Sequence, residues 1–157
     1  MISKKKNQYF LIAILVIFGV YCSLNIGKAW DTFFFIQIGK ERLAYLLSFG
    51  LNTSSESITT IKYPAIYNTL NAFFLQLFPK NFELQVFHII NFIISFLGAL
   101  GVYRLTKYLF NKDTAKYTFA IFLLYPIFFG HMSINDRDPI TIFCNIWIIN
   151  YSYVAKN

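Results

Sequence analysis

The chain has 157 residues, of which 57% are hydrophobic and only 13% are charged, against about a quarter charged in an ordinary soluble domain. This composition excludes a soluble globular protein, and an aromatic content of 20% excludes a disordered chain. The formal net charge of +7 comes from Lys and Arg residues in short groups between long apolar runs, which favours membrane topology over nucleic-acid binding. Cys22 and Cys144 both lie inside apolar runs, so we expect neither a disulfide framework nor a cysteine metal site.

Four apolar stretches are long enough to cross a bilayer as helices, which requires about 20 residues each. They predict membrane spans at about residues 8–27, 84–104, 116–134 and 139–155. The stretches show no period-two alternation, which favours helices over barrel strands. The first follows a group of lysines, as in a signal peptide, but no A-x-A-like cleavage site comes after it, so we expect a retained helix. We therefore predict an all-α polytopic membrane protein.

The charges at the ends of the predicted spans indicate their direction. With the N-terminus in the cytoplasm, eight basic residues and one acid lie inside: Lys4, Lys5, Lys6, Arg104, Lys107, Lys112, Lys116, Lys156 and Asp113. Six basic residues and six acids then lie outside: Lys28, Lys40, Arg42, Lys62, Lys80, Arg137, Asp31, Glu41, Glu56, Glu83, Asp136 and Asp138. Because basic residues concentrate in cytoplasmic loops, we predict a cytoplasmic N-terminus.

The first outer segment, residues 28–83, is too long for a turn and too apolar for a solvated loop. Within it, residues 33–49 mix apolar and charged side chains and predict a helix along the membrane interface, which Gly50 ends. Residues 51–60 are rich in Ser and Thr and predict a loop. Residues 63–78 predict a second interfacial or half-inserted helix, because amide side chains interrupt their apolar run. A fifth span at this second helix is the alternative, and it would invert everything downstream.

Three acidic residues are expected at the outer mouths of the helices. Asp31 follows the first span, and Asp136 and Asp138 occupy the short turn between the third and fourth spans. Burial near lipid raises a carboxyl pKa and makes such a group costly unless it is paired, so the three residues form a candidate site. The alternatives are structural: Asp138 before Pro139 as a helix N-cap, Asp31 as the cap of the next helix, and Asp136 as a solvated turn residue.

Other polar residues of the predicted spans have ordinary interpretations. Asn91 and Ser95 occur singly in mid-span, which favours helix–helix hydrogen bonds. His88 and His131 lie near outer ends of spans, where hydrogen-bonded interface residues are commoner than ligands. Arg137 next to the acids is either a contact for a lipid headgroup or part of the site.

Short motifs along nearly the whole chain carry a family resemblance. They are WDT at residues 30–32, GK at 39–40, LAYL at 43–46, YPAIY at 63–67, YP at 125–126 and GHMSINDRDP at 130–139. On these motifs the chain resembles the GT-C glycosyltransferases, and most closely the protein O-mannosyltransferase-like, ArnT-like and RgtA/B/C/D-like bacterial membrane enzymes.

The resemblance implies transfer of a sugar from a polyprenyl-phosphate donor to a lipid, glycan or protein acceptor. It places the reaction in cell envelope glycosylation, on the outer face of the bacterial cytoplasmic membrane, usually with inversion at the sugar carbon. Asp31 matches the family's first-loop catalytic acid and is expected to act as general base toward the acceptor hydroxyl. His131, in the last motif, is a further candidate for the site.

The leaving phosphate needs a cation, and the sequence offers two sources. Arg137, with Lys62 and Tyr63, is expected to bind the donor phosphate directly. Alternatively Asp136 and Asp138, spaced as D-x-D, hold Mg²⁺ or Mn²⁺, as in the metal-dependent members of the superfamily. We favour the version without a required metal.

Two features depart from the family pattern. Thr32 stands where many relatives carry the second acid of an Asp-Glu pair, and four spans are fewer than the eight or more of most members. We therefore expect residues 1–157 to be the N-terminal transmembrane portion of such an enzyme, in a truncated chain. The alternative is a non-enzymatic membrane protein, either a transporter or an assembly subunit, or an inactive fragment. The chain shows no internal repeat of the kind many transporters have.

Overall fold

The computed structural model describes residues 2–51 and 65–155, and this part of the chain is helical, without a strand. The elements in chain order are α1 (Ile2–Asn25), α2 (Thr32–Leu47), α4 (Ala65–Leu75), the short 3-10 helix η1 (Lys80–Phe82), α5 (Glu83–Leu109), α6 (Lys112–Leu124), α7 (Pro126–Ile134) and α8 (Asp138–Val154). The predicted all-α fold is therefore confirmed over the described ranges.

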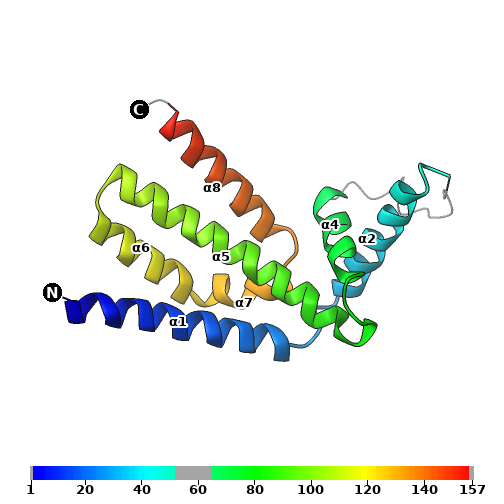
Figure 1. Ribbon diagram of the computed structural model, residues 1–157, viewed down its shortest axis with the longest axis horizontal. Helices are drawn as coiled ribbons and strands as arrows, with labels where there is room; N and C mark the ends of the chain where they lie inside the picture. Colours follow the sequence, from blue (N-terminus) through cyan, green and yellow to red (C-terminus); the bar gives the residue numbers. More distant parts are fainter. Residues whose placement is uncertain (1, 52–64, 156–157) are drawn as a thin grey trace.

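The central helix of the bundle is α5, against which α1, α6, α7 and α8 all pack. Figure 1 shows both termini and the α5–α6 connection at one end of the molecule, and α2 and α4 at the other. We call these the terminal end and the acidic end, the latter after Asp31, Asp136 and Asp138. Small residues on α5 let α8 come close, because a Cβ at Gly101 would lie 2.7 Å from Cγ2 of Ile146.

The core between α1, α5, α6 and α7 is mainly aromatic. Phe92 of α5, Phe119 of α6 and Met132 of α7 are buried there. The rings of Phe96 and Tyr103 meet the ring of Phe119 edge to face, with centroids 6.1 and 5.9 Å apart. These contacts fix α6 and α7 against α5.

The third predicted span, residues 116–134, is not one straight helix. α6 begins earlier, at Lys112, and α6 and α7 meet at an angle of 65°. The cause is Pro126, which has no backbone N–H to donate and forces the residue before it out of the helical region. Tyr125 accordingly has φ −66° and ψ 115°. The break turns the second half of the segment across the bundle.

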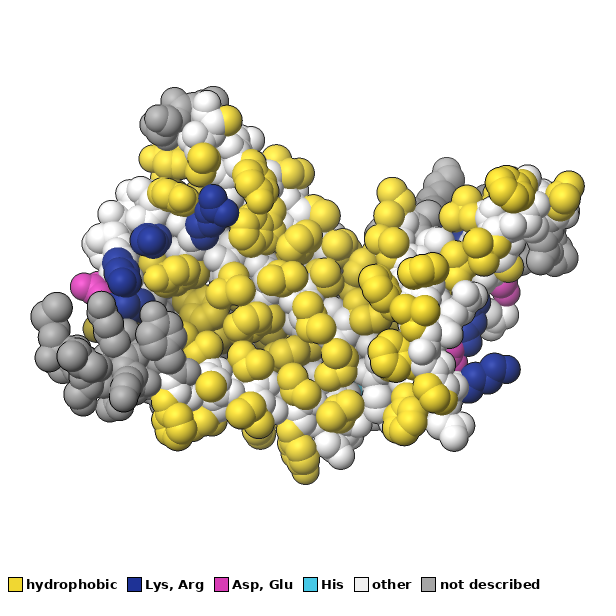
Figure 2. All heavy atoms as spheres, in the orientation of Figure 1, with side chains coloured by type: hydrophobic (Ala, Val, Ile, Leu, Met, Phe, Trp, Pro, Cys, Tyr) yellow, Lys and Arg dark blue, Asp and Glu magenta, His cyan; other side chains and the backbone are white. Residues whose placement is uncertain are grey.

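Membrane-spanning capacity is clear for part of the bundle. Among the described residues, Lys80–Leu109 is long and apolar enough to cross a membrane, and the bent α6–α7 pair is a second such segment if it counts as one span. The apolar part of α1, Ile12–Asn25, and the 17-residue α8 are shorter. Figure 2 shows hydrophobic side chains over the middle of the visible face and charged ones toward its two ends. By this criterion the structure bears out one or two of the four predicted spans.

The two predicted interfacial helices correspond to α2 and α4, which pack against each other. Their contact is close because a Cβ at Gly39 would overlap the carbonyl oxygen of Asn68. Gly50 follows α2 with φ +84°, a left-handed conformation that favours glycine, so the predicted stop is confirmed. An ion pair between Lys40 and Glu83 joins α2 to the start of α5.

Candidate functional site

The acidic end is where the first outer loop and the α7–α8 turn meet. Asp31 immediately precedes α2, and Asp136 and Arg137 form the turn between α7 and α8. These segments are more than 100 residues apart in the chain. The guanidinium carbon of Arg137 lies 4.5 Å from the centre of the Phe35 ring, a cation–π contact that ties the turn to α2.

Asp136 is the buried carboxylate of the site. It is 5% exposed, and its Oδ2 has no hydrogen-bond partner among the described residues. Burial raises the pKa of Asp136 to about 6, while its own backbone N–H and Arg137 work in the opposite direction. The negative charges of Asp31 and Asp138 raise this pKa further, so both carboxylates lie within electrostatic range of Asp136. The alternative of a solvated turn residue at position 136 is therefore wrong.

Asp31 occupies the N-cap position of α2 without using its side chain as a cap. Its backbone oxygen accepts a hydrogen bond from the N–H of Phe35 at 3.2 Å, but its carboxylate makes no capping bond. The loop before α2 is instead closed by Thr32, whose Oγ1 accepts from the N–H of Ala29 at 3.1 Å. The half-buried carboxylate of Asp31 is thus not used to cap the start of α2.

The start of α8 depends on Asn135, a residue that the sequence reasoning did not single out. Its Oδ1 accepts from the backbone N–H groups of Arg137 and Asp138 at 2.9 and 3.2 Å, and its Nδ2 donates to Oδ2 of Asp138 at 2.7 Å. The structural alternative, in which Asp138 is the N-cap, is therefore wrong, because Asp138 is the first helical residue and Arg137 precedes it without a side-chain cap. The sequence did contain a signal, since an N-x-x-D pattern resembles a capping box.

His131 lies on the edge of this cluster. It is exposed, and its Nδ1 lies 3.4 Å from Nδ2 of Asn135. His131 therefore contacts Asp138 only indirectly, through Asn135. Lys62 and Tyr63, the two other predicted phosphate ligands, lie outside the described residues.

A buried set of hydrogen bonds links α1, α4, α5 and α7, and we call it the polar network. Tyr67 of α4 donates to Oδ1 of Asn91 on α5 at 2.5 Å, and Nδ2 of Asn91 donates to the carbonyl oxygen of Ser133 at 3.1 Å. The hydroxyl of Ser133 lies 2.7 Å from that of Ser23 on α1. Burial raises the pKa of Tyr67, so its phenol stays protonated and donates. The network joins four helices, and its Tyr67 lies within electrostatic range of Asp136.

Two expectations for single polar residues can be judged against this network. Asn91 and Ser95 do make interhelical hydrogen bonds, since Ser95 donates to the carbonyl oxygen of Met132 at 3.0 Å, and that interpretation is confirmed. His88 is hydrogen-bonded as expected, with its Nδ1 3.3 Å from the carbonyl oxygen of Ser23, but it is fully buried and not an interface residue.

A metal ion would find two carboxylates here. Asp136 and Asp138 are both at the turn, but the described part of the chain contains no group of three His, Cys, Asp or Glu residues suited to hold a metal. One carboxylate of the pair is also engaged by the Asn135 amide. The D-x-D pair by itself therefore offers a metal ion two side-chain ligands, and the metal alternative stays a prediction.

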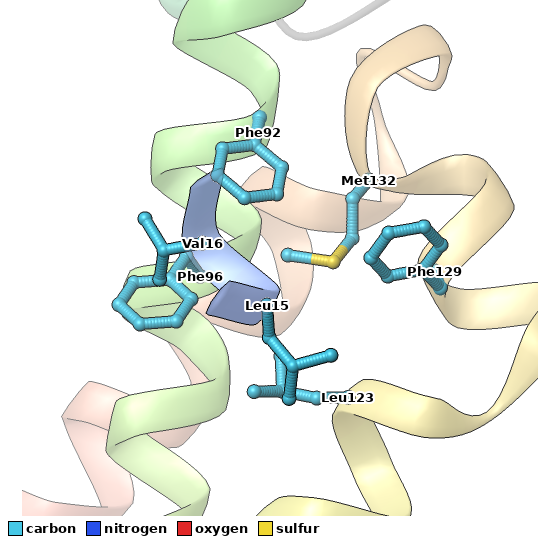
Figure 3. A pocket seen from close by; sticks show the side chains of 7 residues that line it. All are labelled: Leu15, Val16, Phe92, Phe96, Leu123, Phe129 and Met132. Atoms are coloured by element: carbon cyan, nitrogen blue, oxygen red, sulfur yellow. The ribbon is translucent and has the colours of Figure 1, made fainter. Parts of the chain in front are cut away.

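A narrow apolar crevice lies between α1, α5, α6 and α7. Figure 3 shows the side chains that line it: Leu15, Val16, Phe92, Phe96, Leu123, Phe129 and Met132. Its free volume of about 10 Å³ is at the limit for a single water molecule, and no charged group lines it. The crevice is a packing gap and cannot hold a sugar or a phosphate. The acidic end is therefore retained as the candidate functional site.

Comparisons of the chain with protein-family models, with curated proteins and with solved structures found no match.

Proposed function

We propose that the chain is a membrane glycosyltransferase of the GT-C type, which transfers a sugar from a polyprenyl-phosphate donor to a hydroxyl of a lipid, glycan or protein acceptor. The observation that carries the proposal is the acidic end itself. There Asp136 is buried beside Arg137, and the Asp31 carboxylate is close enough to act on the pKa of Asp136. A carboxylate base and a guanidinium at the end of an apolar bundle suit a phosphate-linked lipid substrate.

The proposed setting is the bacterial cytoplasmic membrane. In this arrangement α1, α5, the α6–α7 pair and α8 are four spans, the N-terminus is cytoplasmic, and the acidic end faces outward. Successive connections alternate between the two ends of the molecule, as four spans require (Figure 1). The α2–α4 pair, with Phe33 and Phe34 exposed, would then lie at the outer surface of the cytoplasmic membrane.

In the proposed reaction Asp31 acts as the general base. Its carboxylate takes the proton of the acceptor hydroxyl while that oxygen attacks the anomeric carbon of the donor sugar. The bond from this carbon to the phosphate oxygen breaks, and the polyprenyl phosphate leaves with the electron pair.

Arg137 is proposed to stabilise the negative charge that grows on the leaving phosphate. Its side chain is 37% exposed and held over Phe35, so the guanidinium has access to a ligand from a fixed position. The raised pKa of Asp136 increases the protonated fraction of this carboxyl, and the protonated form does not repel the phosphate as the carboxylate does. Lys62 and Tyr63 stay predicted as further donors to the phosphate.

The test is turnover of a lipid-linked sugar by the chain in proteoliposomes. The probes are radiolabelled polyprenyl-phosphate mannose, glucose, galactose and aminoarabinose, and the readout is release of polyprenyl phosphate. We expect release with at least one probe, abolished by Asp31→Asn and retained by Asp113→Asn, a matched change at the terminal end. No release with any probe would overturn the assignment. Release retained by Asp31→Asn would overturn the role of the base.

A further inference from the structure

The terminal end of the bundle holds an arginine in an aromatic setting. Arg104 lies in the last turns of α5, and its guanidinium carbon is 5.7 Å from the ring centre of Tyr108, 5.6 Å from that of Trp147 and 5.7 Å from that of Tyr151. Two of the three rings belong to α8, so the arginine sits in the seam between α5 and α8. We call Arg104 and these three rings the arginine seat.

The seat is held in place by contacts that do not involve the arginine. Nε1 of Trp147 donates to the carbonyl oxygen of Leu97 at 3.2 Å, which fixes the indole against α5. One turn further along α8, Nδ2 of Asn150 donates to the carbonyl oxygen of Gly101 at 2.9 Å. The rings of Trp147 and Tyr151 lie 5.9 Å apart. The aromatic side chains are therefore preorganised in the absence of a ligand, which lowers the entropic cost of binding.

The charge of Arg104 has no anionic partner in the described part of the chain. The ion pairs there join Lys40 to Glu83, Lys116 to Asp113 and Arg137 to Asp136, and no oxygen accepts a hydrogen bond from the Arg104 guanidinium. The contacts that the described residues make with this guanidinium are with aromatic rings, and none of these residues supplies an acceptor for its N–H groups. A guanidinium in this state lacks the bidentate oxygen ligand for which its geometry is suited.

The surroundings of the seat combine positive charge with apolar surface. Lys107 and Lys112 are exposed at the same end, and Figure 2 shows Lys and Arg side chains gathered there beside hydrophobic ones. Tyr151 of the seat is exposed, as are Ile148 and Val154 beside it on α8. Tyrosine and tryptophan at such a boundary lie at the headgroup level of a bilayer, and apolar residues beyond them contact acyl chains.

We propose that the arginine seat binds the phosphate of an anionic membrane lipid. The guanidinium holds the phosphate oxygens, the neighbouring lysines add attraction, and the exposed apolar side chains of α8 contact the acyl chain. Free inorganic phosphate would meet the same guanidinium but none of the apolar surface. The proposal rests on the membrane setting of the proposed function and not on sugar transfer.

The experiment measures lipid binding to the purified full chain in detergent by native mass spectrometry. The probes are phosphatidylglycerol and phosphatidylcholine, added over a range of concentrations. We expect preferential binding of phosphatidylglycerol, which Arg104→Gln weakens about tenfold, the loss of roughly one charge-assisted contact. Lys112→Gln removes the same charge from the same end and should weaken binding less than about twofold. Arg104→Lys keeps the charge without the planar fork and should give an intermediate value.

Each other result bears on the proposal. Equal binding of the two lipids would overturn it, because the protein would then have no headgroup selectivity. Equal loss of lipid affinity in Arg104→Gln and Lys112→Gln would also overturn it, because binding would then depend only on the net charge of this end. Displacement of the lipid by millimolar inorganic phosphate would overturn the role of the acyl chain. Arg104→Gln should release polyprenyl phosphate from the lipid-linked probes as the unmodified chain does, so failure of the sugar-transfer assay leaves this result readable.

Discussion

Replacing Asn91 by leucine should loosen the attachment of α4 and α7 to α5. Asn91 is fully buried and makes two hydrogen bonds, one with the Tyr67 hydroxyl and one with the Ser133 carbonyl. The substitution leaves both partners buried without a bond. Unpaired buried groups cost about 1–3 kcal/mol each in soluble proteins, whereas measured interhelical bonds in a membrane protein average about 0.6 kcal/mol. We expect a net loss of about 1–3 kcal/mol of unfolding free energy.

The assay is thermal unfolding in detergent micelles, followed by circular dichroism. Asn145→Leu is the matched control, because Asn145 is exposed on α8 and the same change there should leave stability almost unaltered. A double-mutant cycle with Tyr67→Phe isolates the Tyr67–Asn91 bond and should give a coupling of about 0.5–2 kcal/mol. Full additivity of the two changes, or an Asn91→Leu protein as stable as the unmodified chain, would refute the network as a structural link.

Gly39→Val should separate α2 from α4 and lower the unfolding temperature, because a Cβ at this position overlaps the Asn68 carbonyl. Gly130→Ala is the control, since a Cβ there meets nothing within 4 Å. Comparable unfolding temperatures for the two variants would contradict the close contact. Burial raises the pKa of Asp136 from 3.8 to about 6, so the folded state binds this proton more tightly than the unfolded state does. The protonated carboxyl therefore stabilises the fold below about pH 4, and this stability is lost as the pH rises through 6. The free energy of unfolding, measured between pH 4 and 7, should fall by up to about 3 kcal/mol, and Asp136→Asn should reduce this pH dependence. An unchanged pH dependence in Asp136→Asn would mean that another group causes it. In a background without Cys22 and Cys144, cysteines at position 31 and at the exposed position 138 should react with an impermeant maleimide from outside intact cells, and one at position 112 should not. Opposite labelling of 31 and 138 would rule out the proposed topology.

The helices could be predicted from the sequence because each apolar run is continuous and bounded by charges. The apolar runs at 84–104 and 139–155 predict the ends of α5 and α8 to within five residues, and Gly50 marks the end of α2. The bend at Pro126 was not predicted, since the apolar run continues through it and hydropathy carries no information on backbone angle. Proline acts on the residue before it, an effect that is local and independent of the surrounding hydrophobicity.

Part of the candidate site could also be predicted. The convergence of Asp31 with the α7–α8 turn followed from the alternation of span directions, which needs no side-chain detail. The contact of Arg137 with Phe35 and the bond of Tyr67 to Asn91 could not be predicted in the same way, because each depends on helix rotation and on packing across tens of residues. Single-sequence periodicity gives the face of a helix, whereas the partner of that face is set by tertiary contacts.

The burial of Asp136 is not explained by its contribution to stability. A buried carboxyl with a raised pKa lowers the unfolding free energy at neutral pH, and an asparagine at the same position would avoid that cost. The surrounding structure increases the cost further, because it brings two more carboxylates into range and leaves Oδ2 without a hydrogen bond among the described residues. Groups perturbed in this way concentrate at functional sites, where local stability is given up for chemistry. The burial of Asp136 next to a guanidinium therefore favours a ligand-binding role for the acidic end over a purely structural one.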